Sequence, residues 1–586
     1  MLRRTRLAAL ALLLLALALA APAAAQTATS QAGSANAPSA AASTPGVAKA
    51  ASTATTATDP NALTTPSSMD ERPPLHRLTG NQAQRIAERV PKIRDERAKH
   101  KRTTVSVYQK GANRWQVSFF AEGKEIGQVS IWDPTGAVLE AWTGPQVAWT
   151  MARGYEGAFG RKAAALYVWI PLLVLFVAPF VDWRRPLRMR HLDLLALCSL
   201  SVSLAFFNHG NLAGSVPTTY PPLLYLLGRL LWIGYRRGSG GEPLKLLVPV
   251  TWLAVATIFL VGFRIGLNVT NSNVIDVGYS GVIGADRLSH GQDLYGDWPR
   301  DNEHGDTYGP ANYLIYVPFE AVWPWSGSWN DLPAAHGAAV LFDLLCLAGL
   351  FLLGRRIRGP TLGVVLAYAW AAFPFTLFSL NTNSNDALVA ALLIGAMLAA
   401  TSAAGRGAFS ALAATTKLAP LILAPLLATH GAPPASRIRT IGKFAVAFAV
   451  VAAITMIPVW LQGDLRLIWD RTVGFQLDRG APFSVWGYYG GLDGLQKALQ
   501  VATAAFAIAA AFIPRRRDVV GLAAIAGAIL IALQLGMTYW FYLYIIWVLP
   551  FAFVAFFARE PVGRPAPAEP PPPPPADDVA PVLAAS

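Results

Sequence analysis

Long apolar segments between residues 163 and 558 constrain the fold of this chain more than any other feature. Each is about 17 to 25 residues long, enough for a helix to cross a hydrocarbon core of about 30 Å. The composition agrees, because 54% of the residues are hydrophobic and only 14% are charged. We expect a polytopic α-helical membrane protein with eleven spans, near 163–181, 190–207, 218–235, 246–267, 335–353, 361–380, 385–403, 441–461, 497–513, 519–537 and 540–558.

Arginine and lysine gather in short loops between these segments, as in "DWRRPLRMRH", "GRRIRG" and "PRRRD". The positive-inside rule places such loops in the cytoplasm, whereas the loop around His209 has neither residue and should face outward. The net charge of +14 is then explained by topology and by contact with anionic membrane lipids, not by nucleic acid. The pattern predicts a multi-pass plasma-membrane protein whose C-terminal tail is cytoplasmic.

This topology requires that residues 408–428 enter and leave the membrane on the same side. The segment, "AFSALAATTKLAPLILAPLLA", has basic loops on both sides and is interrupted by Pro420 and Pro425. Broken backbone of this kind is tolerated where it lines a cavity walled by protein. We therefore predict a re-entrant segment and two long outward loops, 268–334 and 462–496.

Composition divides the rest of the chain. Residues 1–25 have the basic head, leucine-alanine core and small-residue site of a signal peptide, although an uncleaved anchor is an alternative. The Ala, Ser, Thr and Pro of residues 26–78 predict a disordered linker. Residues 79–160 predict a small α+β domain outside the membrane, with a polar helix at 80–99 and strands "TTVSVYQ", "RWQVSFFA" and "IGQVSIWD". Residues 161–245 would hold three accessory spans, 246–558 the main core, and 559–586 a Pro-rich tail.

The stretch "VIDVGYSGVIGADRLSHGQDLY" follows an apolar segment directly and predicts a short helix from Asp276 to Gly291 at the outer surface. At about 100° per residue, one side of this helix collects a carboxylate, a phenol, a guanidinium and an imidazole. They belong to Asp276, Tyr279, Arg287 and His290. Partial desolvation near the membrane could raise the pKa of Asp276 and suit it to accepting a proton. The alternative is that Asp276 only caps the helix.

The remainder of the first outward loop is rich in aromatic residues, among them Tyr308. They predict an interfacial belt or a platform on which a sugar stacks. The motif "DNEHGD" offers oxygen and imidazole donors without the spacing of a calcium loop, so a metal site there is only an alternative. Cys198 and Cys346 lie inside apolar segments and indicate neither a disulfide nor a cysteine metal site.

Charged residues also occur where topology does not favour them. Arg471 and Arg479 flank Gln476 in the second outward loop and could clamp a phosphate, with ordinary surface positions as the alternative. Lys417 lies at membrane depth, where an ionisable residue is a functional candidate unless it only extends toward the surface. Asn385, in "NTNSND", could cap a helix or contact a hydroxylated ligand.

The ordered motifs "GADRLSHGQDLYG", "TYGPANYLIYVPFE", "NTNSNDALVAALL", "AATTKLAPLILAPLL", "FQLDRGAPFSVWG" and "YWFYLYIIWVLP" resemble those of GT-C integral-membrane glycosyltransferases. The resemblance covers 246–558 and is closest to glycosyltransferase family 87, whose enzymes depend on polyprenyl-phosphate-mannose. The run "WQVSFF…VSIWDPTGAVLEAWTG" resembles PepSY-like exported domains.

This resemblance implies a transferase that moves a sugar, with inversion, from a polyprenyl-phosphate donor to a hydroxyl of a glycan, lipid or protein acceptor outside the cell. Asp276 matches the catalytic aspartate and would be the general base, without a metal or other cofactor. Arg471, Arg479 and Lys417 are the candidates for stabilising the leaving phosphate. Two other functions stay open: a transporter or lipid flippase, in which Asp276 and Lys417 bind or couple, and a sensor or scaffold built on the exported domain.

Overall fold

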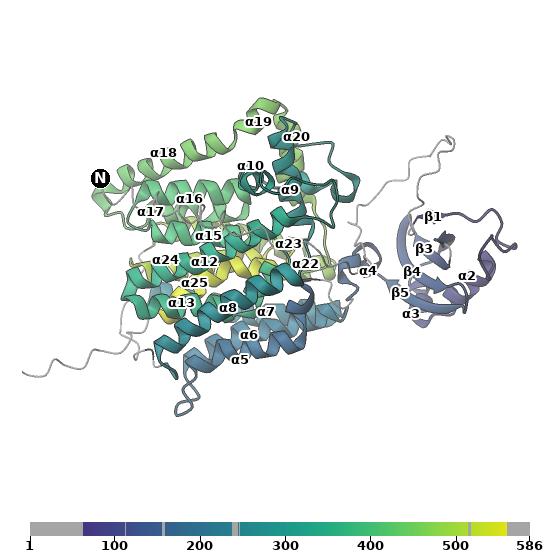
Figure 1. Ribbon diagram of the computed structural model, residues 1–586, viewed down its shortest axis with the longest axis horizontal. Coiled ribbons are helices and arrows are strands. Elements are labelled where there is room, and N and C mark those ends of the chain that lie inside the picture. Colours follow the sequence, from purple (N-terminus) through teal and green to yellow (C-terminus); the bar gives the residue numbers. More distant parts are fainter. Residues whose placement is uncertain are drawn as a thin grey trace, which may run out of the picture.

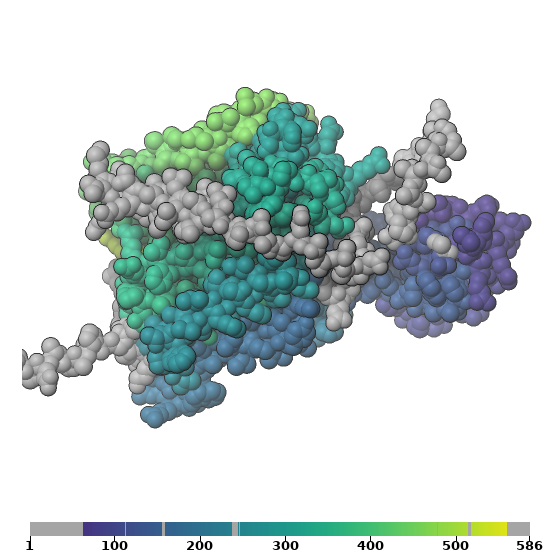
Figure 2. Space-filling model, viewed as in Figure 1, coloured from purple at the N-terminus to yellow at the C-terminus, as the bar shows by residue number. Residues whose placement is uncertain are grey.

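The computed structural model describes residues 62–111, 113–154, 159–236, 244, 246–513 and 517–558 (Figure 1). In these ranges a small sheet domain stands beside one end of a large helical body, and the short helix α4 (Pro145–Ala148) lies between them (Figures 1 and 2). The predicted signal peptide, the predicted linker as far as residue 61 and the predicted Pro-rich tail lie outside the described residues.

The small domain is an antiparallel sheet in which five strands follow one another in sequence order. They are β1 (Leu63–Thr64), β2 (Thr104–Lys110), β3 (Arg114–Ala121), β4 (Lys124–Trp132) and β5 (Ala137–Thr143). Alternate residues of β3, Trp115, Val117 and Phe119, are fully buried in the core beneath helices α2 (Gly80–Glu88) and α3 (Pro91–Ala98). The three predicted strands are confirmed.

Two details of this domain differ from the sequence prediction. The helix predicted at 80–99 is two helices, because Pro91 lacks an N–H and begins the second one. Part of the predicted linker, residues 62–78, belongs to the domain. The carboxylate of Asp133 accepts hydrogen bonds from the backbone N–H groups of Arg77 and Leu78 and from Trp115 Nε1, which holds this segment against the sheet.

The helical body has a helix at each predicted span. The main ones are α5 (Leu166–Val177), α6 (Met189–Asn208), α7 (Leu212–Tyr235), α8 (Val250–Thr270), α12 (Pro333–Arg358), α13 (Pro360–Ala372), α14 (Pro374–Asn381), α15 (Asp386–Leu398), α18 (Arg437–Thr455), α23 (Asp493–Ala509), α24 (Val519–Leu535) and α25 (Ile545–Phe557). Among the described helices, four are long and apolar enough to cross a membrane, and the bent pair α13 and α14 would make a fifth. These apolar helices fit a membrane protein, whereas the number of eleven spans stays a prediction.

Burial separates central from peripheral helices. Nearly every residue of α24 and α25 is buried, as expected for helices that are apolar on all sides. By contrast, α8 and α18 expose large apolar side chains such as Phe259 and Val446. In Figure 1 α18 lies along one edge of the body, so its apolar surface faces outward as expected for a helix in contact with lipid.

The segment predicted to be re-entrant turns back on itself. Helix α16 (Ala403–Thr416) ends at Lys417, and the chain returns through η6 (Ala419–Leu423) and α17 (Ala424–Thr429). The buried guanidinium of Arg406 donates to the carbonyl oxygens of Leu427 and His430, at 2.7 and 2.9 Å. The two ends of the hairpin therefore lie together, with Lys417 at its tip, as the re-entrant prediction requires.

The two predicted outward loops fold into short helices. The first contains α9 (Asp276–Ser289), η5 (Gly305–Thr307), α10 (Pro310–Leu314) and α11 (Val317–Glu320). The second follows α19 (Ile457–Gln462) and contains α20 (Leu465–Trp469), η8 (Asp470–Gly474), α21 (Phe475–Asp478) and α22 (Val485–Tyr488). In Figure 1 α9, α20 and α22 lie at the end of the body nearer the small domain.

Candidate active site

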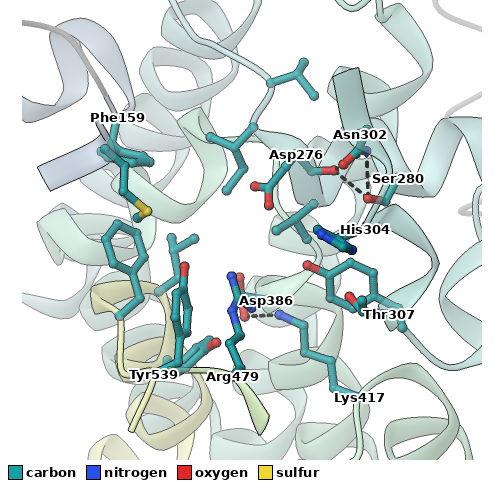
Figure 3. Close-up of a pocket in the computed structure, with 18 of the residues that line it drawn as sticks. Phe159, Asp276, Ser280, Asn302, His304, Thr307, Asp386, Lys417, Arg479 and Tyr539 are labelled. Atoms are coloured by element: carbon teal, nitrogen blue, oxygen red, sulfur yellow. Dashed lines mark hydrogen bonds and ion pairs between the residues drawn. The ribbon is translucent and has the colours of Figure 1, made fainter. Parts of the chain in front are cut away.

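The two predicted outward loops, the hairpin tip, the start of α25 and one face of the small sheet line an open cavity of about 4140 Å³. This volume exceeds that of an ordinary small-molecule site, which is about 300 to 1,000 Å³. The ionisable and aromatic side chains that line its centre are Asp276, His304, Tyr308, Asp386, Lys417, Arg479, Tyr539, Tyr544 and Trp547. Figure 3 shows Asp276 on one side of an open space, with Asp386, Lys417 and Arg479 on the other.

Asp276 is held in place by the chain that precedes it. The N–H groups of Asn273 and Ile275 donate to the carbonyl oxygens of Asn381 and Thr382, both at 3.1 Å. Asn383 adopts a left-handed conformation, with φ of +51°, and its amide donates to Ser272 Oγ and to the carbonyl of Asn273. The motif "NTNSND" thus braces the segment that presents Asp276.

The helix that begins with Asp276 is also packed tightly against this motif. A Cβ atom on Gly278 would lie 2.2 Å from the carbonyl oxygen of Asn383. Because the carbonyl oxygen belongs to the backbone and cannot rotate away, a side chain at position 278 would push α9 away from the motif "NTNSND". The glycine therefore fixes the depth of Asp276 in the cavity.

Replacing Gly278 by alanine should lower the activity of this site about 10²-fold, because a displacement of about 1 Å can cost that much in catalysis. Gly266→Ala is the matched control, since a Cβ there has no atom within 4 Å. The measurement is turnover of purified variants with equal thermal stability. Equal activity of the two variants would show that the brace does not position Asp276.

Asp276 is exposed to the open cavity, which is itself walled by protein (Figure 3). Desolvation by these walls raises the pKa of Asp276, while the charge of Arg479 and the backbone N–H of Val277 oppose this rise. A carboxylate with a raised pKa is a better proton acceptor at neutral pH. Asp276 can therefore serve as a general base toward a hydroxyl group bound in the cavity.

Lys417 is fixed by partners on two helices. Its Nζ lies 2.6 Å from Oδ1 of Asp386, which also accepts from Trp547 Nε1 at 2.9 Å. The rings of Tyr308, Tyr544 and Trp547 lie 5.3 to 5.8 Å from the ammonium group. The second oxygen of Asp386 is buried and has no hydrogen-bond partner among the residues that the structure describes. The pair gives the cavity a positioned cation.

Arg479 stacks on an aromatic ring at the cavity wall. Its guanidinium carbon lies 3.6 Å from the centre of Tyr539 and 5.3 Å from that of Phe475. In Figure 3 it projects into the same space as Lys417. Since an arginine fork binds phosphate oxygens in pairs, Arg479 and Lys417 together can hold a phosphate opposite Asp276.

An apolar groove continues from this polar centre. The hairpin contributes Leu418, Leu421 and Pro425, the region of α18 contributes Phe448 and Met456, and α23 contributes Ala504 and Ile508. Leu418 and Leu421 are exposed although they are large and apolar. The groove begins beside Lys417, so an apolar chain attached to the phosphate can lie along it.

Of the ten residues proposed from the sequence, the cavity brings together Asp276, Tyr308, Lys417, Gln476 and Arg479. The others make contacts elsewhere. Tyr279 is buried against Trp329 and donates to Asp301, and the amide of Asn385 donates to Asn312.

The predicted shared face of α9 does not form one site. Arg287 donates to the carbonyl oxygens of Asp293 and Asp297, and the exposed His290 lies 3.2 Å from Asp286. The helix has the predicted period, but its length of about 21 Å, at 1.5 Å per residue, separates His290 from Asp276.

Arg471, predicted to clamp a phosphate together with Arg479, lies outside the lining of the cavity. Its Nε lies 3.5 Å from the fully buried carboxylate of Asp306. The ion pair attaches η8 to η5, so Arg471 supports the loop that carries Arg479.

The sequence indicated Asp386 only as a helix cap or ligand contact in "NTNSND" and His304 only as a metal donor in "DNEHGD"; it did not indicate Tyr539, Tyr544 or Trp547, which also line the cavity. Asp386 lies at the end of a quoted motif and is a carboxylate in an apolar segment, which was an available signal. In the motif "DNEHGD" only Glu303 and His304 contact each other, whereas Asp301 contacts Tyr279 and Asp306 contacts Arg471. The described residues contain no group of three or more side chains suited to a metal ion.

Comparison with known proteins matches residues 307–537 to the profile of Glycosyltransferase family 87. The match is shorter than the resemblance expected over 246–558; it includes Tyr308, Asp386, Lys417 and Arg479 and begins after Asp276. No curated protein matches the chain. Together with the apolar helices, the match supports a membrane glycosyltransferase of the GT-C type, which implies a sugar donor and an acceptor.

Proposed function

We propose that this protein transfers a sugar from a polyprenyl-phosphate donor to an acceptor hydroxyl on the outer face of the plasma membrane. The observation that carries the proposal is the open cavity between the carboxylate of Asp276 and the cations of Arg479 and Lys417. The apolar groove beside Lys417 favours a lipid-linked donor over a nucleotide sugar. Mannose is the first sugar to test, since the resemblance implies it.

In the proposed reaction Asp276 takes the proton of the acceptor hydroxyl as its oxygen attacks the anomeric carbon of the sugar. The bond from that carbon to the phosphate oxygen breaks on the opposite face, so the configuration inverts. Polyprenyl phosphate leaves with the bonding electrons, and its charge is stabilised by Arg479 and Lys417. Because Lys417 already contacts Asp386, Arg479 is the cation with more capacity for a new anion.

The donor class can be tested in membranes that contain the protein. Radiolabelled mannose, glucose and arabinose would each be supplied as polyprenyl-phosphate and as nucleotide derivatives. We expect transfer from at least one lipid donor and none that depends on the nucleotide derivative alone. Absence of transfer from every lipid donor would reject the proposed function.

Arg479→Gln should lower transfer from the active lipid donor about 10²- to 10³-fold, the usual effect of removing one group that stabilises developing negative charge. Arg466→Gln, in the same loop, is the matched control because the side chain of Arg466 is 93% exposed. Arg471→Gln should reduce stability more than donor use, since it leaves the buried Asp306 without its cation. Normal turnover in Arg479→Gln would remove this residue from the phosphate site.

A further inference from the structure

One face of the small sheet lines the same cavity as Asp276. Residues of β2 to β5 contribute Lys110, Arg114, Gln116, Gln128, Glu140 and Trp142 to the lining. Their neighbours Trp115, Val117 and Phe119 point to the opposite side, into the core beneath α2 and α3. The domain therefore has one face for its own folding and another that borders the proposed active site.

Strand register arranges polar and aromatic groups in rows across this second face. One row pairs Tyr108, Gln116, Ser130 and Glu140, and the next pairs Ser106, Ser118, Gln128 and Trp142. Several contacts among them are long: Lys110 Nζ to Gln116 Oε1 is 3.3 Å, and Gln116 Nε2 to Ser118 Oγ is 3.4 Å. Gln116 and Ser118 are only 6% and 2% exposed, so a ligand hydroxyl group would bind them by replacing these long contacts.

The charged residues that line this face are Lys110, Arg114, Arg153 and Glu140, so both signs are present and positive charge is in excess. Arg153 lies 3.7 Å from Glu140 and donates to Gln128 Oε1 at 2.8 Å. The face has neither an apolar stripe for a lipid nor a single sign of charge for a polyion. A peptide added as a strand would use the sheet edges, not this face. Amide, hydroxyl and aromatic groups together suit a polyhydroxylated ligand.

The connection to the helical body fixes this face beside the cavity. Gln146 Nε2 donates to the carbonyl oxygen of Gly210 at 2.7 Å, and the Trp149 ring lies 5.2 Å from that of Phe483. A Cβ on Gly154 would lie 2.1 Å from the backbone nitrogen of Gly210, so these two backbone segments are in direct contact. These contacts join the small domain to the loop between α6 and α7 and to the second outward loop.

We propose that the polar face of the sheet binds an oligosaccharide acceptor and directs its terminal hydroxyl toward Asp276. This inference rests on the proposed function and specifies the acceptor class as a glycan. The face would hold sugar units that do not react, which raises the local concentration of the acceptor end in the cavity.

The test uses the full chain in lipid nanodiscs and end-labelled hexasaccharides of mannose, glucose and arabinose, with a hydrophilic decapeptide for comparison. Fluorescence anisotropy would give the dissociation constants without any donor. We expect at least one hexasaccharide to bind, and Gln116→Ala with Gln128→Ala to weaken it about tenfold or more, through lost amide hydrogen bonds. Trp142→Ala at the rim of the face is a second variant, in case the double variant does not fold.

Gln84→Ala is the matched amide control, because Gln84 lies on α2 and does not line the cavity. The binding assay contains no sugar donor, so this readout is independent of transfer. Absence of saccharide binding, binding of the peptide alone, or equal affinity in the face variants would overturn the inference. Saccharide binding without any transfer would instead count against the proposed function.

Discussion

Replacing Asp276 by asparagine should lower kcat/KM for sugar transfer about 10²- to 10⁴-fold, the range that general base catalysis contributes. The substitution keeps the shape of the side chain and removes its capacity to take a proton. The brace formed by "NTNSND" contacts the backbone before Asp276, not its carboxylate, so the variant should fold normally. Asp286→Asn, on the same helix but outside the cavity, is the control and should stay active.

The pH dependence provides an independent test of the same role. Because desolvation raises the pKa of Asp276, the wild type should lose activity, as the pH falls, at a higher pH than an ordinary aspartate would allow. The charge of Arg479 favours the ionised carboxylate, so Arg479→Gln should move this acid limb to still higher pH. The measurement is kcat/KM against pH for both proteins. An unchanged limb in Arg479→Gln, or full activity of Asp276→Asn, would exclude Asp276 as the base.

The sequence allowed the helices and three of the central residues to be predicted for identifiable reasons. Apolar segments of membrane length indicate helices whatever their neighbours are. Asp276, Lys417 and Arg479 each stand out locally: a carboxylate beside a span, a cation within one, and an arginine in an outward loop. Each of these residues differs in charge from the residues next to it in the sequence. It can therefore be recognised from one sequence without knowledge of the fold.

The remaining contacts depend on distance in three dimensions. Helical period predicts the direction of a side chain around the axis, but Arg287 and His290 do not line the cavity because they lie too far along α9 from Asp276. Trp547 reaches Asp386 across 161 residues, and no local pattern relates the two. Arg471 and Arg479 look alike in the sequence, and only the position of the buried Asp306 separates their roles.

Two charged residues in apolar segments have a structural role instead of a catalytic one. Arg264 of α8 is fully buried, and its Nε and Nη2 pair with the two oxygens of Asp343 of α12, Nε at 3.0 Å. Its Nη1 donates to the carbonyl of Ala371 and to Thr376 Oγ1, while Trp370 Nε1 donates to Asp343. Ionisable residues in such segments are functional candidates by default, yet here the charged atoms are already bound to one another and to α13 and α14.

Asp343→Asn should therefore destabilise the protein by about 3 to 5 kcal/mol, the cost of leaving a buried charge without its partner. Activity should fall with the folded fraction, and KM should stay the same, because neither residue lines the cavity. Unfolding in mixed detergent measures the loss, with the exposed Asp331→Asn as control. The double variant Arg264→Met with Asp343→Leu should recover most of the stability, since apolar groups can replace a buried pair. If the double variant is as unstable as Asp343→Asn, the uncompensated charge is not the cause.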